Sequence, residues 1–124
     1  EDVADVETIV EDGTVPASGT EGTKNSAITW NGAWSNWAGE QIKHHGGTKT
    51  ETRNDSSAAG SYFEYTFNGT GVEVYSQKHA NFASFDIYVD NVKIGNYSLN
   101  GSSSGDNQQL IFSKTDLTNG EHTI

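Results

Sequence analysis

The chain has 124 residues, with 7 Lys or Arg against 17 Asp or Glu, a net charge of −10, no Cys and no Met. The few, scattered basic residues form no positive stripe that could neutralise phosphates, which argues against a nucleic-acid partner. The lack of Cys excludes a disulfide scaffold, a Cys-ligated zinc and a thiol nucleophile. No apolar run reaches the roughly 20 residues of a membrane-spanning helix, so membrane insertion is not expected.

The negative charge is concentrated at the N-terminus. Residues 1–22 hold seven of the acidic residues, no Lys or Arg, and the linker residues Pro16, Ser18 and Gly19. This composition predicts an acidic linker or tail over residues 1–22, followed by one domain over residues 23–124. A strand at residues 6–10 that pairs with the domain edge is the alternative. Residues 121–124 read as a strand cut short, so we expect a truncated C-terminal strand and a module derived from a longer protein.

From residue 28 onward, short alternating apolar segments are separated by Gly, Asn and Ser, without an apolar period of 3.6 residues. The clearest strand covers residues 62–67, in which Phe63, Tyr65 and Phe67 share the inward face. The segment at residues 68–71 has the residues of a tight turn, and residues 72–76 alternate again. These features predict a hairpin between the two strands.

A second predicted hairpin joins residues 85–89 to residues 92–94 through Asp90 and Asn91. Further strands are expected at residues 28–34, 48–53, 97–99, 109–112 and 121–124. Such a series of short strands without helices predicts an all-β fold, a two-sheet β-sandwich of the immunoglobulin-like or jelly-roll type.

Four segments together resemble the galactose-binding-like jelly-roll modules attached to secreted bacterial carbohydrate-active enzymes and adhesins. They are ITWNGAWSNW (residues 28–37), FNGTGVEVYS (67–76), FDIYVDNVKIG (85–95) and LIFSKTDLTNGEHTI (110–124). The resemblance implies a galactose-binding-like jelly roll, and it places Trp34 and His122 in architectural motifs. The chain departs from the pattern at Asn91, where Gly usually follows the Asp.

A sugar-binding site needs exposed aromatic rings for the apolar C–H faces of the sugar, beside planar polar groups for its hydroxyls. Two segments have this mixture: residues 35–47, in which Trp37 is predicted to lie in a loop past a strand, and residues 77–82. Loops of a sandwich gather at its two ends, so the two segments are expected to meet at one end. The candidate ligand-binding residues are Trp37, His44, His45, His79, Asn81 and Phe82.

Glycoside hydrolysis is an alternative that needs only two carboxylates. In the predicted hairpin, Glu64 and Glu73 lie diagonally on one face. That face should be solvated, and a solvated carboxyl is poorly suited to act as a general acid. Catalysis is therefore not expected.

Metal ligands are sparse in this sequence. Zinc bound by His44, His79 and a carboxylate is one alternative. A structural calcium ion is another, because related jelly rolls often hold one through backbone carbonyls and an acidic side chain. The loop carboxylates that could serve are Asp55, Asp90, Asp106 and Asp116. No cofactor is expected to be required.

Together these features predict a non-catalytic carbohydrate-binding module of a larger secreted or cell-surface bacterial protein, linked covalently to neighbouring domains and binding a glycan. Tethering raises the effective concentration, so modest affinity at a single site would suffice. The alternative is a structural spacer or protein-interaction β-sandwich without a sugar site, and a glycoside hydrolase comes third.

Overall fold

The computed structural model describes residues 7–15, 21–38, 49–52 and 60–124, and these residues form strands and no helix. Accordingly, the described residues contain no helix that is long and apolar enough to cross a membrane. The all-β class predicted from the sequence is confirmed. The strands are β1 (Gly13–Thr14), β2 (Thr23–Lys24), β3 (Thr29–Asn31), β4 (Trp34–Trp37), β5 (Lys49–Thr52), β6 (Tyr62–Glu64), β7 (Thr66–Gly69), β8 (Val72–Lys78), β9 (Ser84–Val89), β10 (Val92–Ser98), β11 (Asp106–Lys114) and β12 (Gly120–Thr123).

The strands of the C-terminal half pair in a nested order. β9 pairs with β10, β8 with β11 and β7 with β12, all antiparallel. The innermost pair is the hairpin predicted at Asp90 and Asn91, where both residues are left-handed with φ of 52° and 64°. Two consecutive positive φ angles are the signature of a type I′ turn, whose twist matches that of the flanking strands.

The hairpin predicted between residues 62–67 and 72–76 is wrong. β7 pairs with β12 and β8 pairs with β11, so the two strands belong to different ladders. Neither Gly69 nor Gly71 is among the described residues with positive φ, which a tight hairpin turn would need. Instead the Leu117 N–H donates to the Thr70 carbonyl at 2.9 Å, and a Cβ on Gly71 would lie 2.9 Å from the Lys114 carbonyl oxygen. The segment is therefore a close-packed crossing from one ladder to the next.

The strand predicted at residues 28–34 is divided into β3 and β4. The break falls at Gly32, which has a φ of 104°, a value that favours glycine. As a consequence β4 extends to Trp37, which pairs with Lys49 of β5. The expectation that Trp37 lies in a loop past the strand is wrong for its backbone.

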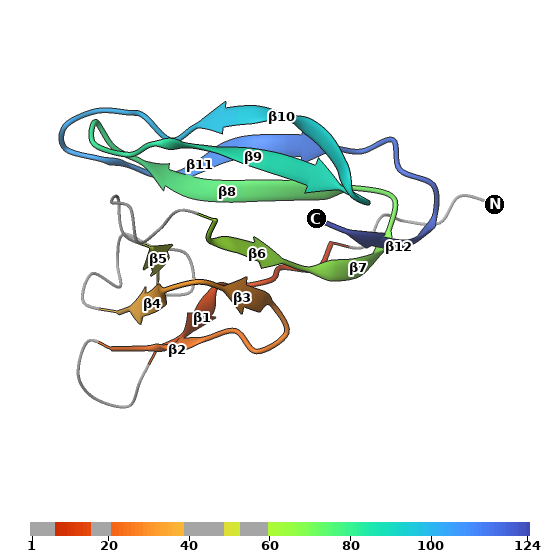
Figure 1. Cartoon of the computed structure of the whole chain (residues 1–124), viewed down its shortest axis with the longest axis horizontal. Coiled ribbons are helices and arrows are strands. Elements are labelled where there is room, and N and C mark those ends of the chain that lie inside the picture. The colour runs from red at the N-terminus through yellow and green to blue at the C-terminus, as the bar shows by residue number, and fades with distance from the viewer. Residues whose placement is uncertain (1–6, 16–20, 39–48, 53–59) are drawn as a thin grey trace.

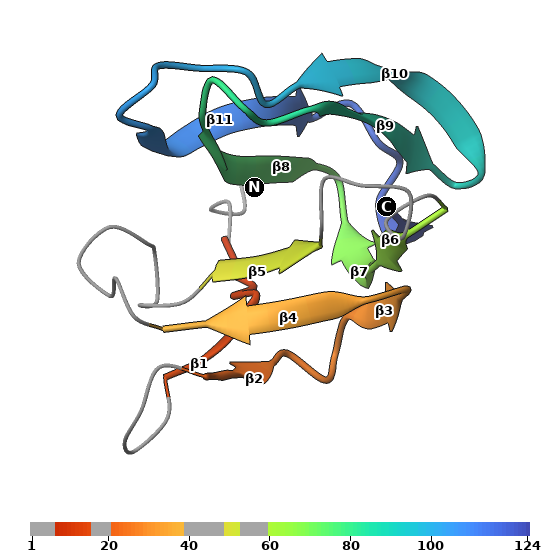
Figure 2. The same ribbon diagram turned by 60° about the vertical axis from the view of Figure 1, so that its left-hand side comes forward.

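The hydrophobic core lies between the β9–β10 hairpin and the β8–β11 ladder. Ile87, Val89 and Phe112 are buried there, and Tyr97 meets the Phe112 ring edge-on at a centroid distance of 5.3 Å. The partly buried hydrophobic residues around them are Val72, Val74, Phe85, Tyr97, Leu117 and Ile124. Figures 1 and 2 show the strands β8, β9, β10 and β11 together in one half of the molecule. The strands from β1 to β5 lie in the other half.

A smaller aromatic cluster joins β3, β4 and β6. The Trp30 ring lies 5.3 Å from Trp34 and 5.5 Å from Phe63 between centroids. Both indole N–H groups donate to backbone carbonyls, that of Trp30 to Asn25 and that of Trp34 to Asn31. Each Trp thus has a packing partner for its ring and an acceptor for its polar atom, as expected of architectural residues.

Part of the acidic N-terminal segment contacts the rest of the fold. β1 pairs with β2, and the Asp12 carboxylate accepts hydrogen bonds from the buried Asn36 side chain and from the Thr50 hydroxyl. Gly13 and Gly22 lie so close to the Asn36 amide that a Cβ at either position would overlap it. The described residues 7–10 form no strand. The boundary predicted at residue 22 stays a prediction, because residues 1–6 and 16–20 lie outside the described residues.

Candidate functional site

Three of the candidate ligand-binding residues lie together in the connection between β8 and β9. The His79 and Phe82 rings contact each other at a centroid distance of 5.4 Å. The Phe82 N–H donates to the His79 carbonyl at 3.0 Å, and the Asn81 N–H donates to His79 Nδ1 at 3.2 Å. Because Nδ1 accepts, the proton of the neutral ring is on Nε2, which can donate a hydrogen bond.

This connection is held by its neighbour, the connection between β10 and β11. The His79 N–H donates to the Leu99 carbonyl at 2.9 Å, and the Ala80 N–H donates to the Ser102 carbonyl at 3.1 Å. The Asn100 side-chain amide donates to the Ala80 carbonyl at 2.9 Å. These three hydrogen bonds to the neighbouring connection give the loop a defined conformation, which a binding site on a loop needs.

The other candidates come from the N-terminal half. Trp37 is described through its backbone, at the end of β4 opposite Lys49, while His44 and His45 lie outside the described residues. Figures 1 and 2 both place the β8–β9 connection at the same end of the molecule as the end of β4 and the start of β5. The structure thus brings the backbone of Trp37 and the loop with His79, Asn81 and Phe82 to one end, on different strand pairs.

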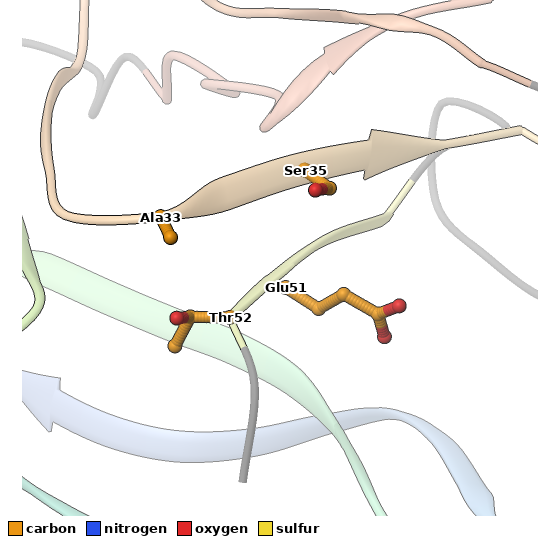
Figure 3. Close-up of a pocket in the computed structure, with 4 residues that line it drawn as sticks. All are labelled: Ala33, Ser35, Glu51 and Thr52. Atoms are coloured by element: carbon orange, nitrogen blue, oxygen red, sulfur yellow. The ribbon is translucent and has the colours of Figure 1, made fainter. Parts of the chain in front are cut away.

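A pocket of about 290 Å³ lies at the β4–β5 pair. Figure 3 shows its lining: Ala33 just before β4, Ser35 in β4, and Glu51 and Thr52 in β5. The Thr52 hydroxyl is buried and has no hydrogen-bond partner within the described part of the chain. Of the polar lining residues, Ser35 and Glu51 are exposed, so the pocket presents one hydroxyl and one carboxylate to solvent. Its described lining has no aromatic ring on which a sugar could stack.

This pocket was not predicted from the sequence. Glu51 pairs across the ladder with Ser35 and forms an ion pair with Lys49 at 3.0 Å. Polar residues in a short strand without apolar alternation gave no signal that distinguished a pocket from a solvated surface.

The carboxylate pair considered for glycoside hydrolysis is not supported. Glu64 is in β6, which pairs with β3, and Glu73 is in β8, which pairs with β11. Both carboxylates are exposed, and Glu73 accepts a hydrogen bond from the Tyr75 hydroxyl at 3.2 Å. The diagonal arrangement depended on a β7–β8 hairpin, which the chain does not form.

Three of the four carboxylates considered for calcium are occupied by protein groups. Asp90 contacts His122, Asp106 accepts from Ser102, and Asp116 forms an ion pair with Lys114. The fourth, Asp55, lies outside the described residues. Within the described part of the chain, no three His, Asp or Glu side chains are grouped to hold a metal ion.

Comparison with known proteins shows similarity to small parts of two large proteins of Flavonifractor plautii. The chain is 34% identical over 97 residues to an "A type blood alpha-D-galactosamine galactosaminidase" and 30% identical over 101 residues to an "A type blood N-acetyl-alpha-D-galactosamine deacetylase". These matches cover 78% and 82% of this chain, but 8% and 12% of the two relatives. No family model and no solved structure matches the chain. The chain is therefore similar to a small region that occurs in two carbohydrate-active proteins.

Proposed function

We propose that this chain is a non-catalytic carbohydrate-binding accessory module of a larger secreted or cell-surface bacterial protein. The observation that carries the proposal is the match of one small all-β region to two proteins that, by their names, act on different forms of the same amino sugar. A region similar in both is more simply explained by a task common to both, such as holding the protein near its glycan, than by either reaction.

The strand pairing supports the finer fold assignment, a galactose-binding-like jelly roll. A jelly roll is a long antiparallel hairpin rolled into two sheets. The nested pairs β9–β10, β8–β11 and β7–β12 have the order of such a rolled hairpin.

We place the principal ligand site at the end of the molecule that carries the β8–β9 connection and the end of β4. We assign to it Trp37, His79, Asn81 and Phe82, together with His44 and His45, which are candidates from the sequence alone and lie outside the described residues. The His79–Phe82 ring pair supplies an aromatic surface, and the Nε2–H of His79 supplies a donor. An aromatic surface beside planar polar groups is the combination that sugar rings require.

A glycan array on the purified chain tests the function, followed by calorimetry with the strongest hit. Trp37→Ala and Phe82→Ala are each expected to weaken binding at least 10-fold, since aromatic residues dominate binding hot spots with contributions of about 2 kcal/mol or more. Tyr75→Ala is the matched control, because Tyr75 is 59% exposed on β8, outside this site. An array without any hit would overturn the proposal and favour the structural spacer.

A further inference from the structure

A second group of residues has the composition of a sugar-binding surface, and it lies on strands instead of loops. Phe85, Ile87 and Val89 of β9 face the core, so the alternate residues of this strand face outward. In the ladder with β10, Asp86 pairs with Asn96 and Tyr88 pairs with Lys93. We call these four outward residues, Asp86, Tyr88, Lys93 and Asn96, the β9–β10 outer face.

Tyr88 is the aromatic ring of this face and is 48% exposed. Cross-strand partners on one face have Cβ atoms about 5 Å apart, and positions two residues along a strand are about 7 Å apart. Tyr88, its partner Lys93 and the Asp86–Asn96 pair therefore lie within the reach of one short saccharide. The buried core on the inner side of the hairpin consists of Ile87 and Val89 of β9 and Phe112 of β11, and the Tyr88 ring is not part of it.

The polar groups of the face are held in place by one another. The Asn96 side-chain amide donates to Asp86 Oδ1 at 3.0 Å, and Lys93 Nζ lies 3.4 Å from Asp86 Oδ2. The hydrogen bond from Asn96 and the charge of Lys93 lower the pKa of Asp86, so this carboxylate is ionised at neutral pH. The amide of Asn96 retains its carbonyl acceptor and a second N–H donor for a ligand.

The charge of this face differs from that of the chain as a whole. The chain carries a net charge of −10, whereas Asp86 and Lys93 form a locally neutral pair. The net negative charge of the chain repels anionic glycans, so a neutral saccharide is the class of ligand that suits this face.

The type I′ turn at Asp90 and Asn91 matches the twist of the hairpin, and the four side chains project from its paired strands. Sites on strands are positioned more accurately than sites on loops. We propose that the β9–β10 outer face is a second saccharide-binding surface, in which the Tyr88 ring stacks on the apolar C–H face of a neutral sugar while Asp86 and Asn96 hydrogen-bond its hydroxyls. This inference rests on the proposed carbohydrate-binding function, and it places contacts outside the proposed loop site.

The test is an NMR titration of the ¹⁵N-labelled chain with methyl N-acetyl-α-D-galactosaminide, with lactose as a second neutral probe. Saturable amide shifts are expected at residues 86–88 and 93–96. Tyr88→Ala is expected to weaken binding at this face at least 10-fold, and Asn96→Ala is expected to weaken it as well. Tyr75→Ala, which removes a more exposed Tyr from β8, should leave the shifts unchanged. The amide spectrum of each variant reports its folding, and Asn96→Ala tests the face independently of the Tyr88 ring.

The outcomes separate this inference from the proposed function. Shifts confined to residues 79–82 and the end of β4, unaffected by Tyr88→Ala and Asn96→Ala, would overturn the second surface and leave carbohydrate binding standing. No shift with either probe, together with an array without hits, would overturn both. Equal weakening by Tyr88→Ala and Tyr75→Ala would also contradict the inference, because it would show a general loss of aromatic surface.

Discussion

His122 and Asp90 connect the last strand to the turn of the β9–β10 hairpin. Nδ1 of His122 lies 2.6 Å from Asp90 Oδ2, and Nε2 lies 2.6 Å from the Thr118 carbonyl oxygen. Both partners are acceptors, so this arrangement favours the imidazolium form, in which both ring nitrogens donate. The other Asp90 oxygen accepts from the Thr123 N–H, and the Asp90 N–H donates to the Thr123 carbonyl. His122 is buried, and this contact holds β12 in place.

This contact predicts a stability maximum at mildly acidic pH. The Thr118 carbonyl and the Asp90 carboxylate raise the pKa of His122 above its ordinary value of 6.5, so its stabilisation is complete below that value and is lost as the pH rises through the raised pKa. The hydrogen bonds from His122 and the Thr123 N–H lower the pKa of Asp90 below its ordinary value of 3.8, so its stabilisation is lost only as the pH falls through that lowered value.

Melting curves at about pH 5.5 and about pH 8.5 measure this dependence. The higher Tm is expected at the acidic pH, because the stabilisation by His122 is complete below its ordinary pKa and declines as the pH rises through the raised pKa. His122→Gln should remove most of the difference. His79→Gln is the control, because His79 lies in the β8–β9 connection, away from this contact. A wild-type Tm that rises from the acidic to the alkaline condition would contradict the assignment of a charged ring.

Asp12 ties the N-terminal segment to the domain, and its removal should reduce stability. The linker composition of residues 1–22 predicts almost no loss, but in the structure Asp12→Ala deprives the buried Asn36 amide of an acceptor. We expect a loss of about 1–3 kcal/mol, the cost of leaving a buried polar group unsatisfied. Urea unfolding of Asp12→Ala and of Glu7→Ala, an exposed acidic residue in the same segment, provides the comparison. Equal stabilities would show that the segment is a simple linker.

Phe112 is expected to contribute more to stability than Phe67. Phe112 is 4% exposed in the core, whereas Phe67 is only half-buried and contacts Tyr65 and His122. Phe112→Ala should cost about 3–5 kcal/mol and Phe67→Ala clearly less. Chemical denaturation of the two variants measures the difference. A larger loss for Phe67→Ala would place the main core around β7 instead of between β9 and β11.

Asn91 occupies a left-handed position, with a φ of 64°. Asn91→Val should destabilise the fold by about 1–2 kcal/mol, because a β-branched residue is strained in this conformation. Asn91→Gly should stay within about 0.5 kcal/mol of the wild type, since glycine adopts positive φ without steric cost. Thermal unfolding of both variants checks the order, and equal stabilities would exclude a type I′ turn.

Local patterns in the sequence predicted the strands better than their partners. Alternation placed β9 correctly, and the Asp90-Asn91 pair identified the tight β9–β10 hairpin, because both signals lie within a few residues. The partner of β7 was predicted incorrectly, because Asn68, Gly69 and Gly71 suit a turn as well as a close-packed crossing. Only the distant Lys114 carbonyl and Leu117 N–H decide between these two uses.

The arrangement of the candidate site could be predicted in part for the same reason. The mixture of ring and polar groups at His79, Asn81 and Phe82 is visible in the sequence, but the hydrogen bonds that fix this loop come from Leu99 and Ser102 on another connection. The alternation that identified Ile87 and Val89 as core residues also identifies Asp86 and Tyr88 as outward. Their polar partner Asn96 follows only from the register with β10, which shifts at a bulge between Lys93 and Gly95.

The nested pairing of the C-terminal half also shapes how the chain reaches its fold. Thr66 and Thr123 meet across 57 positions of sequence, a separation that by itself makes loop closure slow. Once β9–β10 has formed on its two-residue turn, however, the ends of β8 and β11 are already near each other, and their pairing in turn brings β7 and β12 together. Each step then closes a short loop, so these three strand pairs can form one after another, from the turn outward. On such a route, changes at the turn slow folding, while changes at His122, which joins last, speed unfolding.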